Sequence, residues 1–296
     1  MANLRDIRKR IEASINIKKI TKTMEKISSV RMIQAMKRLD NYRGYGNALF
    51  QYCSDLYITA VNTEKDFHGI CMLKGREKVR SVSLIVITAN QGMCGGFNNA
   101  VTQLAEKEFK KHKEAQRSVM IYALGKKGYQ YFKRKDFPVE KMESNYSDKV
   151  TINDVTSITM QIQKDFKNEK VDEAYLLYTK YFSTSNRAPV SEILLPCKKY
   201  LKNLNIDTRK VCLCSPTIQE LSELAGPELL SNRILRGLLE SILCEHISRR
   251  FAMQQASTTA KDMIDELRGI YNTVRKSKIT SELNEIMGTV MALGRR

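Results

Sequence analysis

The sequence predicts an α/β protein in which a Rossmann-like α/β domain is inserted between two long terminal helices that form an antiparallel coiled coil. Three observations lead to this fold class. Apolar residues recur every three or four positions near both ends, as on one face of a helix. No proline or glycine precedes Gly44. Between the ends, short β-branched runs alternate with helical stretches, which favours a mostly parallel sheet covered by helices. The expected division is a helix at 1–60, an α/β domain at 75–215 and a helix at 217–296.

The N-terminal helix is predicted to pack through two sets of apolar residues separated by a phase shift, which coiled coils tolerate. These sets are Leu4, Ile7, Ile11 and Ile15, followed by Ile17, Ile20, Met24 and Ile27.

The C-terminal helix has a more regular pattern, typical of a coiled-coil seam. Gly226-Pro227 either begins this helix or kinks it. From 227 to 293 it would be about 100 Å long, more than one compact domain can cover. It must therefore pair with the N-terminal helix or insert into something else. The predicted seam is Ala256, Ala260, Met263, Leu267, Ile270 and Val274, then Ile279, Leu283, Ile286, Val290 and Leu293.

The middle of the chain alternates between strand and helix patterns. Strands are expected at 82–87, 119–124, 174–181 and 190–195 and around Val211, because these runs are short and rich in β-branched or aromatic residues. A helix is expected at 97–113 and a short one after 125–128. Another helix should end near Lys167, with Thr151 and Asn153 as its capping residues.

Composition excludes several classes of protein. With 42% hydrophobic residues the chain is too apolar to be disordered. The uncharged stretch 81–105 contains asparagines, glutamines and glycines, whose polar groups would be unpaired in a bilayer. Seven cysteines without a C-x-x-C pair and three scattered histidines argue against zinc and favour reduced thiols in a cytoplasmic compartment.

The loop at 90–98 contains Gly92, Gly95 and Gly96 between a strand and a helix, where α/β proteins often bind phosphates. It matches neither phosphate-binding glycine motif, so a tight turn is the favoured interpretation. Cys94 within it is a candidate nucleophile, although no histidine is close in sequence. The turn at 125–128 has the same two interpretations.

The net charge of +18 suits an anionic partner without choosing among nucleic acid, membrane and acidic protein. Residues 1–43 are the most basic segment, with 12 basic and 4 acidic side chains. Their basic face could bind phosphates, be solvated, or meet an acidic protein.

Three separated blocks together resemble the gamma subunit of the rotary F-type ATP synthase, and the resemblance extends over essentially the whole chain. The middle block is Cys94-Gly95-Gly96-Phe97-Asn98, similar to that family's turn after a buried strand. The first block is Ile7-Arg8, Arg10-Ile11, Asn16, Lys19-Ile20-Thr21-Lys22 and Met24; the last is Tyr271-Asn272, Arg275, Ile279-Thr280 and Glu282-Leu283. The chain departs from the family pattern at Gln254, Thr258, Thr259 and Lys276, and at Gly226-Pro227.

The resemblance implies a non-catalytic central shaft without a cofactor, which couples ion flow through the c-subunit ring to conformational cycling of the catalytic beta subunits. Its implied partners are the alpha and beta subunits, the epsilon subunit and the c ring. A chain that starts at Met1 without a convincing presequence favours the cytoplasmic face of a bacterial inner membrane. The implied rotor–stator contacts are Arg275, Thr280 and Glu282, followed by Met24, Lys26, Glu245 and Arg249.

Two other classes remain as alternatives. A basic coiled-coil protein that binds nucleic acid would explain the charge, but no base-reading module is recognisable. An enzyme built on Cys94 would need a base and an oxyanion donor nearby, and no motif supplies them.

Overall fold

The computed structural model describes residues 4–62, 76, 78–141, 150–197, 215 and 217–293. The chain forms two compact units. The helical unit comprises Met1–Ser28 and Arg249–Arg296, and the α/β unit comprises Ser29–Ser248. The division expected from the sequence assigned each terminal helix to a segment of its own, whereas each compact unit contains parts of both helices. That three-segment division stays a prediction.

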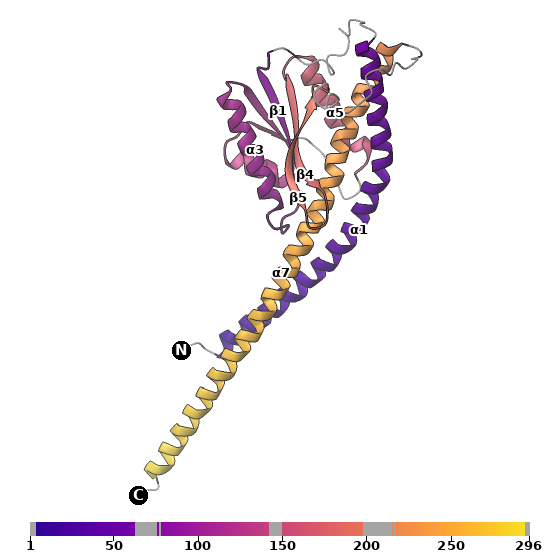
Figure 1. The fold of residues 1–296 in the computed structure, drawn as a ribbon. Helices are drawn as coiled ribbons and strands as arrows, with labels where there is room; N and C mark the ends of the chain where they lie inside the picture. The colour runs from indigo at the N-terminus through magenta and orange to yellow at the C-terminus, as the bar shows by residue number, and fades with distance from the viewer. Residues whose placement is uncertain are drawn as a thin grey trace. The chain divides into compact units, whose positions relative to one another are not determined.

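The chain begins and ends with a long helix, α1 (Leu4–Asn62) near the N-terminus and α7 (Ile218–Leu293) near the C-terminus (Figure 1). α7 is continuous through Pro227, so the prediction that this proline begins the helix is wrong, and the alternative of a kink stays a prediction. The cost is one missing backbone hydrogen bond, since proline has no N–H to donate to the carbonyl four residues earlier. Buried Ala225, Leu229 and Leu230 hold this part of α7 against the core.

The two helices are antiparallel, as predicted. In the α/β unit, the Tyr42 hydroxyl donates to the Asn232 carbonyl at 3.3 Å and the Tyr45 hydroxyl donates to Glu228 at 2.9 Å. Cys53 Sγ lies 3.9 Å from the Ala225 carbonyl. In the helical unit, Ser14 Oγ contacts Met263 Sδ at 3.5 Å. Residue numbers therefore rise along α1 as they fall along α7.

The α/β unit contains a five-stranded sheet in the order β3-β2-β1-β4-β5. β1 (Ser81–Ile87) is central and runs parallel to β2 (Ser118–Leu124) and β4 (Glu173–Tyr181). β3 (Val139–Lys141) continues the parallel order beyond β2, whereas β5 (Arg187–Leu195) is antiparallel to β4. The short edge strand β3 was not predicted, and the strand expected around Val211 lies outside the described residues.

Three shorter helices complete this unit: α3 (Phe97–Glu114), α4 (Lys126–Arg134) and α5 (Ile152–Lys167). Thr151 is the N-cap of α5, as expected, and forms a reciprocal capping box with Asp154. Asn153, the other expected cap, lies inside the helix.

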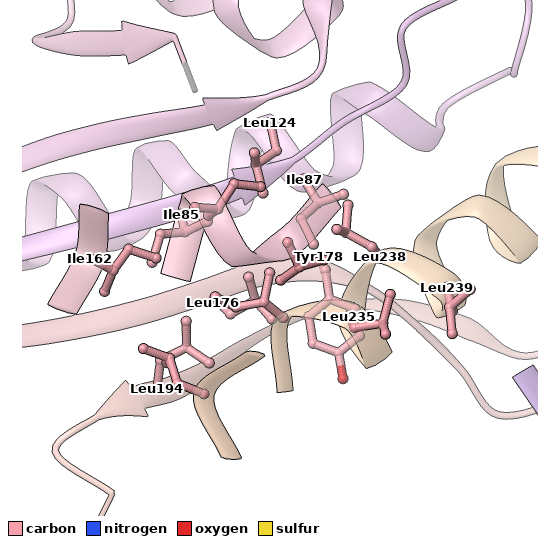
Figure 2. Packing of buried hydrophobic residues seen from close by; sticks show 14 of the residues in the cluster. Ile85, Ile87, Leu124, Ile162, Leu176, Tyr178, Leu194, Leu235, Leu238 and Leu239 are labelled. Atoms are coloured by element: carbon pink, nitrogen blue, oxygen red, sulfur yellow. The ribbon is translucent and has the colours of Figure 1, made fainter. Parts of the chain in front are cut away.

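The sheet is covered on both faces, and alternate residues of each strand enter two different clusters. Val82, Leu84 and Val86 of β1 pack with α3 and α4, while Ile85 and Ile87 point to the opposite face. There they meet α5, α1 and α7, as Figure 2 shows for Ile162, Leu235 and Leu238. This second face makes the larger cluster, so the terminal helices are part of the core of the α/β unit.

In the helical unit, the predicted seam of α1 is partly wrong. Ile17, Ile20 and Ile27 are 52%, 63% and 42% exposed. The buried positions recur every seven residues, as a coiled-coil face requires. They are Ile7, Ser14, Thr21 and Ser28.

The facing seam of α7 is shifted in the same way. Ala260 is buried as predicted, but Met263 and Ile270 are 49% and 41% exposed. Met253, Ser257 and Ile264 are buried in addition. Small and polar side chains thus occupy much of the contact, because the helical face chosen by the fold is not the most apolar one.

Candidate contact surface on the paired terminal helices

A basic groove of about 820 Å³ lies between α1 and α7 in the helical unit. Five lysines, one arginine and a single aspartate line it. We call it the lysine groove; its residues are Ile15, Lys18, Lys19, Lys22, Thr23 and Lys26 from α1, with Lys261, Ile264, Asp265 and Arg268 from α7.

Helical periodicity places these cations together. Lys18, Lys22 and Lys26 are spaced by four residues and share one face of α1. On α7, Lys261 and Arg268 are seven residues apart and also share a face. Like charges on adjacent helices repel, so an acidic partner in the groove would relieve this repulsion and bind with favourable electrostatics.

The same part of α1 also exposes apolar side chains. Ile17, Ile20 and Ile27 occupy positions on its outer surface, where water covers about half of each side chain. Burial of apolar area is the main driving force of protein association, so a partner that covered this face would bind with a favourable free energy.

The last turns of α7 extend past the helix that pairs with it. Since Ser14 lies against Met263 in an antiparallel pair, Leu4 lies opposite about residue 273, at 3.6 residues per turn in both helices. From 275 to 290 all side chains are exposed. Five of them are large and apolar, namely Ile279, Leu283, Ile286, Met287 and Val290.

These two helices are not membrane spans. Within the described residues, no helix combines the length and the apolar character that crossing a bilayer requires.

Comparison with known proteins decides the family. The family model described as ATP synthase matches residues 3–293. The ATP synthase gamma chain of Leptospira biflexa is 30% identical over 293 residues, covering 99% of this chain and 100% of the relative. That of Rhodopirellula baltica is 30% identical over 299 residues, covering 99% of both chains. The chain belongs to the ATP synthase gamma family.

Solved structures share the fold of this gamma-family chain. A chain of the Euglena gracilis mitochondrial ATP synthase, solved with OSCP, F1 and the c ring, has a TM-score of 0.65 at 16% identity, and the match covers 98% of this chain and 94% of that one. A chain of the Tetrahymena thermophila mitochondrial central stalk and c ring has a TM-score of 0.59 at 21% identity, covering 80% and 99%.

The C-terminal motif residues of this gamma-family chain are all exposed on α7. Arg275 and Glu282 are seven residues apart and share a face, whereas Thr280 lies about 140° around the helix from Arg275. The Thr280 hydroxyl donates to the Lys276 carbonyl at 3.0 Å, and Glu282 lies 3.7 Å from the Lys278 ammonium. Neither interaction prevents contact with another protein, because both are solvent-exposed.

The other four predicted contact residues have different surroundings. Lys26 is exposed and lines the lysine groove, and Met24 beside it is half-buried. Glu245 is half-buried, and Arg249 is only 4% exposed. By the antiparallel pairing, Met24 lies opposite about residue 253, so it is roughly 30 Å along α7 from Arg275. The structure therefore separates the predicted contacts into distinct places.

Sequence reasoning missed the contribution of α7 to the lysine groove. Lys261, Asp265 and Arg268 have the spacing of one helical face, which the sequence displays. That this face borders the basic face of α1 depends on the register of the two helices, which the sequence did not give.

The glycine loop of this gamma-family chain is a turn braced by its own side chains. Met93 and Gly95 both have φ of 58°, the left-handed conformation that favours glycine. Asn98 Oδ1 accepts a hydrogen bond from the Ala89 N–H at 2.8 Å, and Asn98 Nδ2 donates to Cys94 Sγ at 3.2 Å. Cys94 is 2% exposed and packs with Phe97 and Cys244. A buried thiol packed among apolar groups is poorly placed to attack a substrate.

The turn at 125–128 has a packing role as well. The Gly128 N–H donates to Thr88 Oγ1 at 2.9 Å, and a Cβ on Gly128 would lie 2.6 Å from that oxygen. Glycine is therefore needed here for close approach of α4 to β1. Among the described residues, no three His, Cys, Asp or Glu side chains cluster closely enough to hold a metal ion.

Proposed function

We propose that this chain is the non-catalytic central shaft of an F-type ATP synthase, which couples ion flow through the c ring to conformational cycling of the catalytic beta subunits. The observation that carries the proposal is the family match over residues 3–293. The exposed apolar end of α7 and the lysine groove support it, because both are surfaces with affinity for partners. Family membership leaves the nucleic-acid-binding alternative without support.

The mechanism requires contact rather than chemistry. A helix pair with one basic face and several apolar patches is asymmetric about its own axis. Turning it inside a ring of three beta subunits would present a different face to each subunit. Each beta site would then be biased toward a different conformation by its differential contact energy with the shaft. The catalytic residues belong to the beta subunits.

The partner of each surface follows from its chemistry. The lysine groove suits acidic loops of the beta subunits, and the exposed apolar turns of α7 suit apolar surfaces inside the ring of alpha and beta subunits. The α/β unit is left for the epsilon subunit and the c ring. The chain would be peripheral to the membrane, on the cytoplasmic face of a bacterial inner membrane.

Arg275, Thr280 and Glu282 are proposed as contacts with the beta subunits, since all three are exposed on the unpaired turns of α7. Met24 and Lys26 are proposed as contacts near the lysine groove. Glu245 and Arg249 keep their proposed contact role, although the burial of Arg249 restricts it to atoms at the surface of the helix pair.

The first test is assembly. The chain would be co-expressed with the alpha and beta subunits of the same organism, and the complex would be sized and assayed for ATP hydrolysis. We expect one copy of this chain per three alpha–beta pairs, and an altered hydrolysis rate when the chain is truncated from Arg275 onward. A chain that stays monomeric beside an assembled alpha–beta ring would refute the proposal.

The second test separates charge in the lysine groove from the total charge of the chain. Replacing Lys18, Lys22 and Lys261 with Glu should weaken assembly at low salt by at least tenfold, because it reverses the sign of the lysine groove. The matched control replaces the same number of lysines, Lys107, Lys110 and Lys113, exposed on α3, with Glu and should assemble normally. Equal effects of the two sets would show that only total charge matters and would remove the groove from the proposal.

A further inference from the structure

A second, smaller cavity of about 60 Å³ lies between α1 and α7 inside the α/β unit. It is separate from every surface discussed above and does not depend on the proposed shaft function. Its lining contains three arginines and two asparagines but no acidic residue. The residues are Leu39, Tyr42, Arg43, Gly46, Asn47 and Phe50 from α1, with Leu229, Asn232, Arg233 and Arg236 from α7.

Asn232 is the central polar group of this cavity. The residue is only 4% exposed, and its Nδ2 has no hydrogen-bond partner in the described part of the chain. A buried N–H group without an acceptor is destabilising, so native structures almost always supply a partner. The cavity is the direction from which an acceptor can reach this amide.

Gly46 keeps the space beside that amide open. A Cβ at this position would lie 3.3 Å from Asn232 Oδ1 and 3.6 Å from Nδ2. Gly46 is inside a helix, where glycine is unfavourable relative to alanine. Gly44, two residues earlier, has no atom within 4 Å of its hypothetical Cβ. A side chain at Gly46 would therefore fill space beside Asn232, whereas a side chain at Gly44 would not.

The arginines give the cavity a fixed, donor-rich rim. Arg43 is 3.2 Å from Asp40, Arg233 is 2.9 Å from Glu192, and Arg236 is 2.9 Å from Glu240. Each carboxylate lies outside the lining of the cavity and holds its guanidinium in place. A guanidinium has five N–H donors. Arg43 donates one of them to Asp40, and Arg236 donates one to Glu240.

We propose that this cavity binds one small oxyanion, a carboxylate or a phosphate. The charged oxygens of such a group accept hydrogen bonds, and the cavity offers the Asn232 amide and the arginine rim as donors. Planar guanidinium groups match the geometry of both anions. One water needs about 10–15 Å³ of such space, so the cavity has room for a small anion and not for a nucleotide.

The test measures inorganic phosphate binding to the full chain by calorimetry and by the shift of melting temperature. Chloride at equal ionic strength is the reference, because ligand binding to the native state raises its stability. We expect Gly46→Ala and Asn232→Leu to weaken phosphate binding at least tenfold, and Arg43→Gln to weaken it several-fold. Gly44→Ala, which changes helix propensity equally but fills no cavity, should bind as the wild type does.

Two results would overturn the proposal. One is the absence of phosphate binding, together with the absence of acetate binding, to the folded wild-type chain. The other is equal binding by wild type, Gly46→Ala and Asn232→Leu, which would place the anion elsewhere. A double variant, Lys18→Gln with Lys22→Gln, tests the lysine groove as that other place and should leave the affinity unchanged.

The source of the anion is distinguished in the assembled complex. If a carboxylate side chain of a neighbouring subunit fills the cavity, phosphate binding measured on the free chain should be lost on assembly. If the ligand is free phosphate, the assembled complex should keep the same affinity and the same sensitivity to Gly46→Ala.

Discussion

The two units of this chain use the same two helices in opposite ways. In the α/β unit, α7 buries Leu229, Leu230, Leu235 and Leu238 against the sheet. In the helical unit, Ile7, Met253 and Ile264 are also buried, but most of the buried positions are small or polar and Ile17, Ile20 and Ile27 stay exposed; the small or polar positions are Ser14, Thr21, Ser28, Ser257 and Ala260.

The difference shows which unit contributes most of the free energy of unfolding. Fully burying one Leu or Ile side chain contributes about 1.5–3 kcal/mol, so the α/β unit has many such contributions. A seam in which most buried positions are serine, threonine or alanine contributes less apolar area. The helical unit leaves many of its large apolar side chains outside, where partner proteins can cover them. These exposed side chains add little to folding and are available for association.

The prediction with the largest expected effect compares the same substitution, isoleucine to alanine, in each unit. Ile85→Ala, in the sheet core, should lower the free energy of unfolding by about 2–5 kcal/mol, because it leaves a cavity. Ile20→Ala, at 63% exposure in the helical unit, should change it by less than about 0.5 kcal/mol. Urea unfolding followed by circular dichroism measures both. A loss above 1 kcal/mol for Ile20→Ala would show that this face is covered in the free chain.

A buried charge sharpens the contrast through pH. Asp172 accepts hydrogen bonds from Arg76 at 2.6 Å and from the backbone N–H groups of Arg80 and Ser81 at 2.7 and 2.9 Å. Burial alone would raise the pKa of this carboxyl, but these hydrogen bonds outweigh burial and hold the pKa below its usual value. Asp172→Asn should therefore cost about 1.5–3 kcal/mol at pH 7.

The sign of the pH dependence follows from the lowered pKa of Asp172. Its contribution is fully present above the unfolded pKa, near 4, and is lost as the pH falls through the folded pKa. The difference in melting temperature between wild type and Asp172→Asn should shrink below about pH 4. A difference that stays constant from pH 7 to pH 3 would contradict this account.

Two glycines in α7 provide a matched pair across the units. A Cβ on Gly237, in the α/β unit, would lie 2.6 Å from Leu176 Cδ2, and Leu176 is itself buried in the core. Gly237→Ala should destabilise the chain by about 1–3 kcal/mol through overpacking. Gly269 in the helical unit has no atom within 4 Å of its Cβ position, so Gly269→Ala should stabilise the helix by up to about 1 kcal/mol.

Tyrosine fluorescence and circular dichroism separate the two glycine effects. The chain has 13 tyrosines and no tryptophan, and only Tyr271 lies in the helical unit. Gly237→Ala should lower the unfolding midpoint measured by tyrosine fluorescence. Gly269→Ala should raise the unfolding midpoint measured by circular dichroism and leave the fluorescence midpoint unchanged. If both variants shift both probes in the same direction, the two units do not differ in packing as described.

The smallest expected effect concerns the ion pair of Lys278 and Glu282. Its atoms are 3.7 Å apart and its side chains are more than half exposed. Glu282→Gln should change the free energy of unfolding by no more than about 0.5 kcal/mol. An altered ATP hydrolysis rate in the assembled complex, at unchanged stability of the free chain, would then assign Glu282 to contact with a partner. Equal hydrolysis rates would remove it from the proposed contacts.

Much of the fold could be predicted from the sequence, because its signals are local. The β-branched run at 82–87 predicted β1, and Thr151 predicted the start of α5 through a capping interaction within one turn. The prediction missed β3, since three residues carry too little periodicity to be recognised. Of the candidate site, the basic face of α1 was predicted, whereas its proximity to Lys261, Asp265 and Arg268 of α7 depends on the register of the two helices.

The sequence by itself determined that α1 is a long helix carrying apolar residues at intervals of three and four positions. It could not determine which face meets α7, because helical periodicity defines a stripe and not its partner. Tertiary structure decided that point: within the helical unit, the register in which Ser14 meets Met263 puts Thr21 and Ser28 inside and Ile20 outside. The physical reason is that a helix buries the face that its partner covers. Ser14 and Met263 are 249 residues apart in the sequence, so local periodicity does not encode the contact that selects this face.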